Sequence, residues 1–172
     1  MTSHPLAKFL VLSVVSFCIG TLHGMLQVLP SIRKWLDSIG SPYGGPGHMI
    51  DPLAHAHMNL VGGVVLLAMC TTYYLLPIFT GRAIHSRRLI DHTFWWTVVG
   101  SYGFYLAQMV FGIWEGVLMN TDPERMAAVH RFYGPLVALS GTVMALGFSF
   151  YLINIALTLR GPAVARGQEP SA

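Results

Sequence analysis

Charged side chains are scarce in this sequence. Lys, Arg, Asp and Glu make up 10% of its 172 residues, whereas a soluble domain carries about 25%. Hydrophobic residues make up 53%, and the mean hydropathy is +0.57. No run of five or more basic residues occurs, so the charge pattern of a nucleic-acid-binding protein is missing. The composition predicts an integral membrane protein whose surroundings are the lipid bilayer, with no nucleic-acid partner.

Cysteine and the common catalytic motifs are also scarce. Cys18 and Cys70 both fall in apolar runs, where they fit core packing better than a disulfide or a metal knuckle. The sequence contains no P-loop, no G-x-S-x-G, no H-E-x-x-H and no C-x-x-C-H. The absence of the last motif argues against covalently attached heme.

Long apolar stretches, in contrast, are plentiful. Four of them reach the roughly 20 helical residues that cross about 30 Å of hydrocarbon: 6–29, 52–78, 89–119 and 126–159. The glycines and prolines of 41–47 predict a loop, after which Asp51 and Pro52 suit the N-cap and first turn of a helix. We expect an all-α, four-transmembrane-helix bundle, with one membrane domain over 1–160 and a disordered tail over 161–172.

The loop charges predict the orientation of this bundle. One side holds Lys8, Arg82, Arg87, Arg88, Arg160 and Arg166. The other side holds Arg33, Lys34, Arg125 and Arg131, with the acids Asp37, Asp51, Asp122 and Glu124. The positive-inside rule makes the first side cytoplasmic, so both termini are expected there. The predicted location is a bacterial inner membrane, crossed several times.

Five ionisable side chains are predicted at one depth, towards the outer, periplasmic face. They come from all four stretches: His23, His55, His57, Glu115 and His130. Ionisable groups at membrane depth are costly and indicate function. Two residues correspond to about 200° around an α-helix, so His55 and His57 are expected to point to opposite sides of one helix. Such a helix could stand between two cofactors, or between a cofactor and a polar partner.

A heme would explain both the histidines and several glycines. Heme iron takes one or two axial imidazoles, and small residues let a flat porphyrin lie close to a helix. The motifs Gly20–Gly24 and Gly112–Gly116 each carry a polar residue just before the second glycine, and Gly134 and Gly141 lie in the fourth stretch. The alternative is that these glycines only permit close helix packing, and the sequence leaves both interpretations open.

The ligand candidates can be ranked from the sequence. His57 and His55 lead, with interfacial histidines bonded to carbonyls and water as the alternative. His130 and His23 compete for a second axial position, and Arg131 could pair with a heme propionate through its forked guanidinium. Glu115 could carry protons, or it could be a structural partner of Arg131 or of a histidine.

Copper is the inorganic competitor for these histidines, because neutral imidazole also binds copper. Met25, Met49 and Met58 lie near the same depth and could support a copper site. Methionines in apolar helices are more often packing residues. The sequence therefore favours non-covalent protoheme (heme b) over copper.

The order of residues resembles the last four helices of the catalytic subunit of heme-copper oxidases, closest to the cbb-type oxidases and the related nitric oxide reductases. The likeness covers roughly 6–159, with weaker matches in the first and fourth helices. The matching stretches are His55-Ala56-His57-Met58-Asn59-Leu60, Tyr73-Tyr74-Leu75-Leu76-Pro77, His92-Thr93-Phe94-Trp95-Trp96 and Phe111-Gly112-Ile113-Trp114-Glu115-Gly116-Val117-Leu118-Met119.

The resemblance implies separate roles for the two histidines. In that family the first histidine of the H-x-H binds the high-spin heme and the second binds the low-spin heme. Carried over, His55 is the high-spin-type ligand and His57 the low-spin-type ligand. The family subunit is much longer, and the helices that this chain lacks carry the other low-spin ligand, the histidines of the non-heme metal and the proton channels. Glu115 stands where the cbb-type pattern usually has glutamine.

The hypothesis is therefore a membrane cytochrome of b type, with His57 as the best single ligand. It would carry electrons within a respiratory or oxidoreductase complex, beside other membrane subunits or a second copy of itself, with cytochrome c as a candidate periplasmic electron carrier. We do not expect this chain to reduce oxygen or NO alone. The alternatives are the heme-bearing piece of a split oxidase or nitric oxide reductase, and a heme-free structural or assembly subunit.

Overall fold

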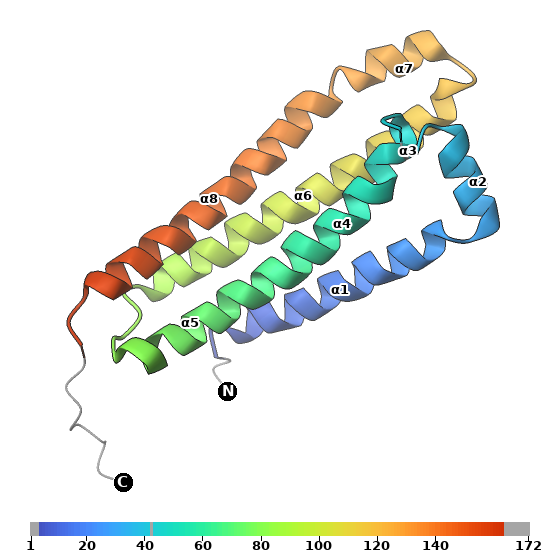
Figure 1. Ribbon diagram of the computed structural model, residues 1–172. Helices are drawn as coiled ribbons and strands as arrows, with labels where there is room; N and C mark the ends of the chain where they lie inside the picture. The colour runs from blue at the N-terminus through green and yellow to red at the C-terminus, as the bar shows by residue number, and fades with distance from the viewer. Residues whose placement is uncertain (1–3, 42, 164–172) are drawn as a thin grey trace.

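The computed structural model describes residues 4–41 and 43–163. Every regular element in these residues is a helix. In chain order these elements are α1 (Ala7–Gln27), α2 (Pro30–Ser38), α3 (Pro46–His48), η1 (Met49–Ala54), α4 (His55–His57), η2 (Met58–Val65), α5 (Leu66–Thr80), α6 (Arg87–Met119), α7 (Pro123–His130) and α8 (Tyr133–Arg160). Figure 1 shows the long helices side by side in an elongated bundle, with α2, α3 and α7 at one end. The all-α prediction is confirmed. Of the tail predicted over 161–172, residues 164–172 lie outside the described residues.

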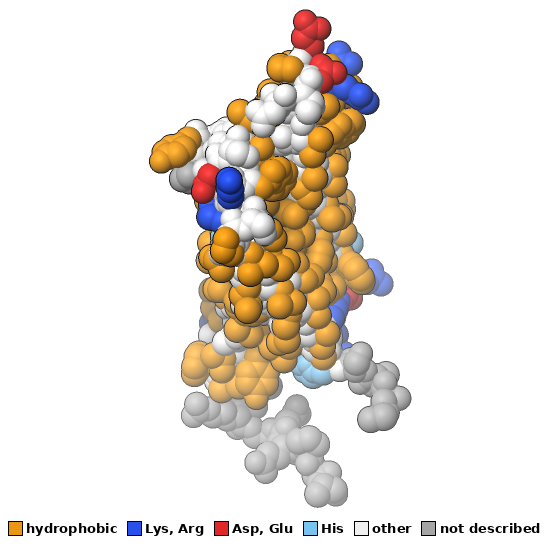
Figure 2. All heavy atoms as spheres, turned by 90° about the vertical axis from the view of Figure 1, so that its right-hand side faces the viewer, with side chains coloured by type: hydrophobic (Ala, Val, Ile, Leu, Met, Phe, Trp, Pro, Cys, Tyr) orange, Lys and Arg blue, Asp and Glu red, His pale blue; other side chains and the backbone are white. Residues whose placement is uncertain are grey.

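Three helices in the described part of the chain are long and apolar enough to cross a membrane. They are Ala7–Gln27, Pro46–Thr80 and Pro123–Arg160. The remaining predicted span, 89–119, corresponds to α6, which has 33 residues but is less apolar. Its packed face carries buried polar side chains: Thr93, Thr97, Ser101, Gln108 and Glu115. Figure 2 shows apolar side chains over most of the bundle's length on the face in view, with charged side chains at the α2 and α7 end and a smaller group at one edge nearer the other end. The chain is an integral membrane protein.

The second long helix begins earlier than predicted, at Pro46. It is interrupted at Asp51, whose backbone is extended, with φ −129° and ψ 114°. Asp51 stands directly before Pro52, in the N-cap position predicted for it, but its carboxylate bonds the guanidinium of Arg33 on α2 and makes no cap bond to a helix amide. A charged partner competes better for a carboxylate than a backbone N–H does.

The fourth predicted helix is divided into α7 and α8, which are separated by Arg131 and Phe132. The cause is Pro135, which has no N–H to donate to the carbonyl of Arg131, four residues earlier. The start of α7 is well capped, since the Asp122 side chain accepts a hydrogen bond from the Arg125 N–H at 3.0 Å. The break lets α7 turn away from the line of α8 (Figure 1).

The closest packing in the bundle joins α6 to α8. A Cβ built on Gly100 would lie 2.4 Å from the Met144 nitrogen, and one on Gly147 would lie 2.5 Å from the Thr97 nitrogen. Only glycine fits at such distances, so the two backbones are in direct contact. The main apolar cluster lies towards the other side of α6, where Phe9 of α1 and Phe94 of α6 have ring centroids 4.9 Å apart.

Candidate functional site

The H-x-H motif lies in a locally unusual part of its helix. The α-helical segment α4 (His55–His57) is flanked on both sides by the π-helical segments η1 and η2. π-helical turns are rare and frequently occur at functional sites. Behind the motif, η2 packs tightly on α1: a Cβ on Gly63 would lie 2.7 Å from the Phe17 ring. The two histidines are therefore held on a helix that is fixed against α1.

The two histidines face different neighbouring helices. The His55 ring meets the His23 ring of α1, with centroids 5.9 Å apart and an interplanar angle of 77°. The His57 ring lies against the Phe104 ring of α6, with centroids 4.6 Å apart. The prediction that they point to different sides of one helix is confirmed. Any cofactor bound by one histidine would lie apart from a cofactor bound by the other.

The half-buried His57 ring has a defined tautomer. Its Nδ1 lies 2.8 Å from the carbonyl oxygen of Leu53, one turn earlier in the same helix. A carbonyl only accepts, so Nδ1 carries the proton and donates it. In the neutral ring the lone pair is then on Nε2. An imidazole whose Nδ1–H is held by a carbonyl is the usual form of a metal-binding histidine, because the hydrogen bond fixes the ring and makes Nε2 more basic.

Five of the glycines predicted to flank a porphyrin separate into two groups, while a Cβ on the sixth, Gly24, would only touch the His55 ring at 3.6 Å. Close packing accounts for three of them, because a Cβ would meet Asn59 at 2.5 Å from Gly20, Ile50 at 2.6 Å from Gly112, and Ile39 at 2.5 Å from Gly116. Gly134 and Gly141 of α8 are different, because a Cβ there would meet nothing within 4 Å. Their space is open, so packing in this chain does not explain them.

The position of Gly141 on α8 shows which way that open space faces. Phe148 lies seven residues later, two helical turns, and so on nearly the same side of the helix. Phe148 packs against the apolar cluster that contains Leu66 and Tyr73 of α5. Gly141 therefore faces the same side of α8 as Phe148, the side that packs on α5, but further towards the α7 end. The lone pair on His57 Nε2 suits the iron of a non-covalent heme, and the open space beside Gly141 leaves room next to α8.

His23, in contrast, has both ring nitrogens occupied. The Gln27 side-chain N–H₂ donates to His23 Nε2 at 2.9 Å and to the Ile50 carbonyl at 3.0 Å. Nδ1 then carries the proton and faces the hydroxyl of Tyr105 on α6 at 3.4 Å. His23 is buried, and in this arrangement it joins α1, η1 and α6. A free lone pair for iron is not available on His23 here.

His55 belongs to the same polar cluster. Its Nδ1 is buried without a hydrogen-bond partner among the described residues, and the nearest acid is Asp51, whose Oδ1 lies 3.7 Å away. The other Asp51 oxygen bonds Arg33. The neighbouring Asp37 and Asp51 carboxylates raise the pKa of Arg33 above its ordinary value. A charged pair at the end of the bundle is thus followed inwards by His55, His23 and Tyr105.

Glu115 and His130 form a second pair, nearer the α7 end. His130 Nδ1 lies 2.9 Å from Glu115 Oε2, while Glu115 Oε1 is buried and has no hydrogen-bond partner in the described part of the chain. The carboxylate is 3% exposed and the imidazole is 56% exposed. Glu115 therefore has a histidine as its structural partner. Arg131 does not join this pair; its guanidinium lies over the Phe132 ring, 4.7 Å from the centroid.

The structure does not bring His57 and His130 together. His57 packs on Phe104 and His130 bonds Glu115, and both of these partners are on α6. They are eleven residues apart, which is about 16 Å along a helix axis. Two axial ligands of one iron would have to be much closer. No group of three or more His, Cys, Asp or Glu side chains able to hold a metal ion occurs among residues 4–41 and 43–163.

Several residues that shape the site were not predicted from the sequence. They are Gln27, Asp51, Leu53, Phe104 and Tyr105. Two of them carried a signal: Gln27 follows His23 by one helical turn, and Leu53 precedes His57 by one turn. Phe104 and Tyr105 carried none, because aromatic residues on a membrane helix are commonly packing or lipid-facing.

This fold and site define a helical membrane protein that carries the H-x-H histidines on one of its long helices. The model of the family described as "Cytochrome C and Quinol oxidase polypeptide I" matches residues 52–147, more than half of the chain. The chain belongs to this family. The match begins at the helix that carries the H-x-H motif and ends within α8, so it includes His55, His57, Phe104, Glu115, His130 and Gly141.

Curated relatives are named as cytochrome c oxidase subunits. A "Cbb3-type cytochrome c oxidase subunit CcoN1" from Stutzerimonas stutzeri is 25% identical over 140 residues, covering 80% of this chain and 27% of its own length. A "Cytochrome c oxidase subunit 1 homolog" from Azorhizobium caulinodans is 22% identical, covering 96% of this chain and 31% of its own length. The chain thus spans less than a third of these relatives. The resemblance drawn from the sequence is confirmed.

Proposed function

We propose that this chain is a four-span membrane cytochrome of b type in which His57 is an axial ligand of a non-covalent heme. The observation that carries the proposal is the hydrogen bond from His57 Nδ1 to the Leu53 carbonyl at 2.8 Å, which leaves Nε2 as the iron-binding atom. The open space at Gly134 and Gly141 supports it. A bound heme supplies a one-electron couple, so the function is electron transfer within an oxidoreductase complex.

The second axial position is proposed to come from another chain, either another membrane subunit or a second copy. Both ring nitrogens of His23 are occupied, one by Gln27 of α1 and the other by Tyr105 of α6. His130 has a free Nε2 but lies about 16 Å from the level of His57 along α6. The chain spans 27% and 31% of two relatives, so parts that complete the site in those proteins could be supplied here by a partner.

The proposed orientation follows from the charges. If α6 also spans the membrane, α1 starts and α8 finishes on the side of the bundle that is rich in cations. The positive-inside rule then makes both termini cytoplasmic. The end that carries α2 and α7 is then periplasmic, and the His57 site lies towards it (Figure 1). A periplasmic carrier such as cytochrome c would approach from that side. The proposed membrane is a bacterial inner membrane.

A split oxidase or nitric oxide reductase is the second candidate, and the short coverage of the relatives favours it. In that case His55 would bind a five-coordinate heme once its partner chain is present. In the structure His55 Nε2 faces α1, where a Cβ on Gly24 would lie 4.0 Å away, so α1 would have to move. A CO-reactive high-spin spectrum of the assembled complex would distinguish this candidate from the cytochrome.

The test is a pyridine hemochrome assay on the purified wild-type protein and on His57→Ala and His92→Ala. His92 is the matched control, because it packs on Phe150 with ring centroids 5.2 Å apart, nearer the start of α6. We expect heme b in the wild type and in His92→Ala, and loss of most of it in His57→Ala. Unchanged heme in His57→Ala would refute the ligand assignment, and a wild-type protein without a Soret band would identify a heme-free subunit.

A further inference from the structure

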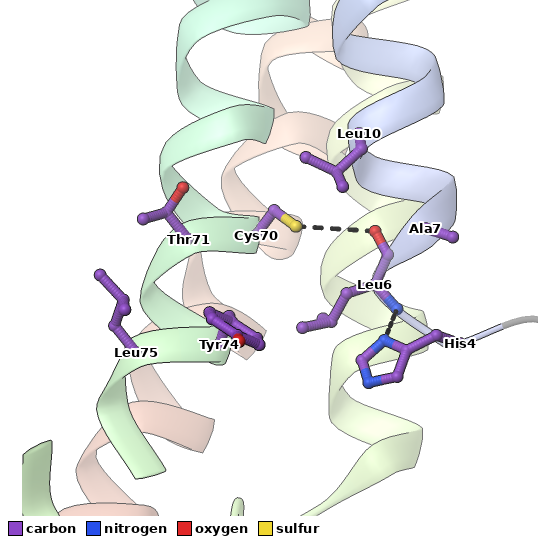
Figure 3. Close-up of a pocket in the computed structure, with 8 residues that line it drawn as sticks. All are labelled: His4, Leu6, Ala7, Leu10, Cys70, Thr71, Tyr74 and Leu75. Atoms are coloured by element: carbon purple, nitrogen blue, oxygen red, sulfur yellow. Dashed lines mark hydrogen bonds between the residues drawn. The ribbon is translucent and has the colours of Figure 1, made fainter. Parts of the chain in front are cut away.

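A cavity of about 450 Å³ lies between the start of α1 and the middle of α5. Figure 3 shows its walls: Leu6 and Leu10 on one side, Cys70, Tyr74 and Leu75 on the other. The Cys70 thiol does not provide a free polar group, since it donates to the Leu6 carbonyl at 3.6 Å. The lining is almost entirely apolar, so the cavity suits a hydrocarbon chain.

A second cavity, of about 380 Å³, adjoins the first. His4, Leu6 and Tyr74 line both of them, so the two cavities lie next to each other at the start of α1. The second cavity also reaches Arg87, at the start of α6. The combined space is therefore apolar along α1 and α5 and polar at the end of the bundle.

The polar part offers hydrogen-bond donors. The Leu6 N–H donates to His4 Nδ1 at 3.3 Å, so the neutral His4 ring carries its proton on Nε2. Tyr74 contributes a hydroxyl and Arg87 a guanidinium. None of the residues that line either cavity is an Asp or Glu. This arrangement suits a head group that accepts hydrogen bonds and carries negative charge.

The charge of the surrounding surface also suits an anionic head group. This end of the described bundle carries Lys8, Arg82, Arg87, Arg88 and Arg160, and Asp91 is its acid. Asp91 is already paired with Lys8. Arg82 donates to the Leu159 carbonyl, whereas Arg87 has no ion-pair partner among residues 4–41 and 43–163. An anion at Arg87 would supply the charge that the chain itself does not.

We propose that this cavity is a binding site for one anionic phospholipid, with its phosphate at Arg87 and His4 and an acyl chain along Leu10 and Leu75. Arginine recognises phosphate through paired N–H donors, and basic sites between membrane helices at the interface bind anionic head groups. The site lies at the opposite end of the bundle from α2 and α7. The proposal does not depend on heme binding.

The test is native mass spectrometry of the full-length protein titrated with dioleoylphosphatidylglycerol or with zwitterionic dioleoylphosphatidylcholine. The variant Arg87→Gln removes the phosphate partner, and Arg88→Gln is the matched control, because Arg88 is its neighbour but lines neither cavity. Ala7→Phe narrows the apolar part independently of charge, since Ala7 lines it. The protein should bind one phosphatidylglycerol in preference to phosphatidylcholine, with affinity about tenfold or more lower in Arg87→Gln.

Arg88→Gln should retain wild-type affinity, and Ala7→Phe should weaken binding of both lipids. Equal affinity for the two lipids would overturn the proposal. Equal losses in Arg87→Gln and Arg88→Gln would also overturn it, because they would indicate attraction to a charged surface without a site. Displacement of the phospholipid by added ubiquinone at equal concentration would assign the cavity to a quinone instead.

Discussion

His57 and His23 differ in their free ring nitrogens, and this difference decides what each can bind. His57 donates from Nδ1 to a carbonyl of its own helix and keeps the lone pair of Nε2 for a ligand. His23 accepts from Gln27 on Nε2 and faces Tyr105 with Nδ1, so it connects helices. Residue type alone does not separate these roles; the hydrogen-bond partners do.

The Glu115–His130 pair gives a prediction at the residue scale. His130→Ala would leave a buried carboxylate without its hydrogen-bonded partner, so we expect stability to fall by about 1–2 kcal/mol. Adding Glu115→Gln to that variant should restore part of the loss, because a buried neutral amide is less costly than a buried charge. Thermal unfolding in detergent measures both. A double variant less stable than His130→Ala would contradict this account of the pair.

The Arg33–Asp51 ion pair gives a second residue-scale prediction. Asp37 and Asp51 raise the pKa of Arg33 further above its already high ordinary value, and a raised folded-state pKa gives stability that is lost only as the pH rises through that pKa. Arg33→Ala should therefore cost about 1 kcal/mol, with no change between about pH 6 and about pH 9. Chemical unfolding at both pH values tests this, with Lys34→Ala as the control. A loss confined to one pH value would show that another group titrates.

At the scale of elements, the closest contact is between α6 and α8. Gly147→Ala would place a Cβ 2.5 Å from the Thr97 nitrogen, so the helices would have to separate, at an expected cost of about 1–3 kcal/mol. Gly134→Ala meets nothing within 4 Å and should be neutral or slightly stabilising. The melting temperatures of the two variants in detergent should differ accordingly. Equal melting temperatures would mean that α8 is not held as the structure shows.

The elements also show how far sequence reasoning reaches. Apolar length predicted α1, α6 and the helix that carries His57, because a membrane span needs about 20 apolar residues whatever its contacts. It missed α2, a short helix that starts at Pro30 and buries Leu36 while exposing charge. It also missed the break at Arg131, although Pro135 is the visible cause. Short interfacial helices and breaks depend on local packing and hydrogen bonding, which apolar length does not report.

The candidate site was predictable only where it depends on the geometry of a single helix. Spacing alone placed His55 and His57 on different sides of one helix, since helix geometry fixes that angle. The partners of each histidine come from other helices, such as Tyr105 and Phe104 of α6. Those contacts depend on how the helices are rotated against one another. The sequence could therefore nominate His23 and His130 as ligands without seeing that Gln27 and Glu115 already bond them.

At the scale of the whole molecule, the chain is short for its family. It covers 27% of one curated relative and 31% of another, and α8 packs mainly on α6 while Gly134 and Gly141 stay open. If a second copy supplies the other axial ligand, heme should bind at one per two chains. The molar ratio of heme to protein tests this, together with the protein mass of the complex after the detergent contribution is subtracted. One heme per single chain in a monomer would contradict it.

The claim that His57 ligates heme through Nε2 is tested most directly by chemical rescue. His57→Gly should lose the low-spin heme spectrum, and imidazole added during heme reconstitution should restore it by occupying the vacated ligand position. The matched variant His55→Gly should keep the spectrum without imidazole. A His57→Gly protein that retains a wild-type low-spin spectrum in the absence of imidazole would contradict the account.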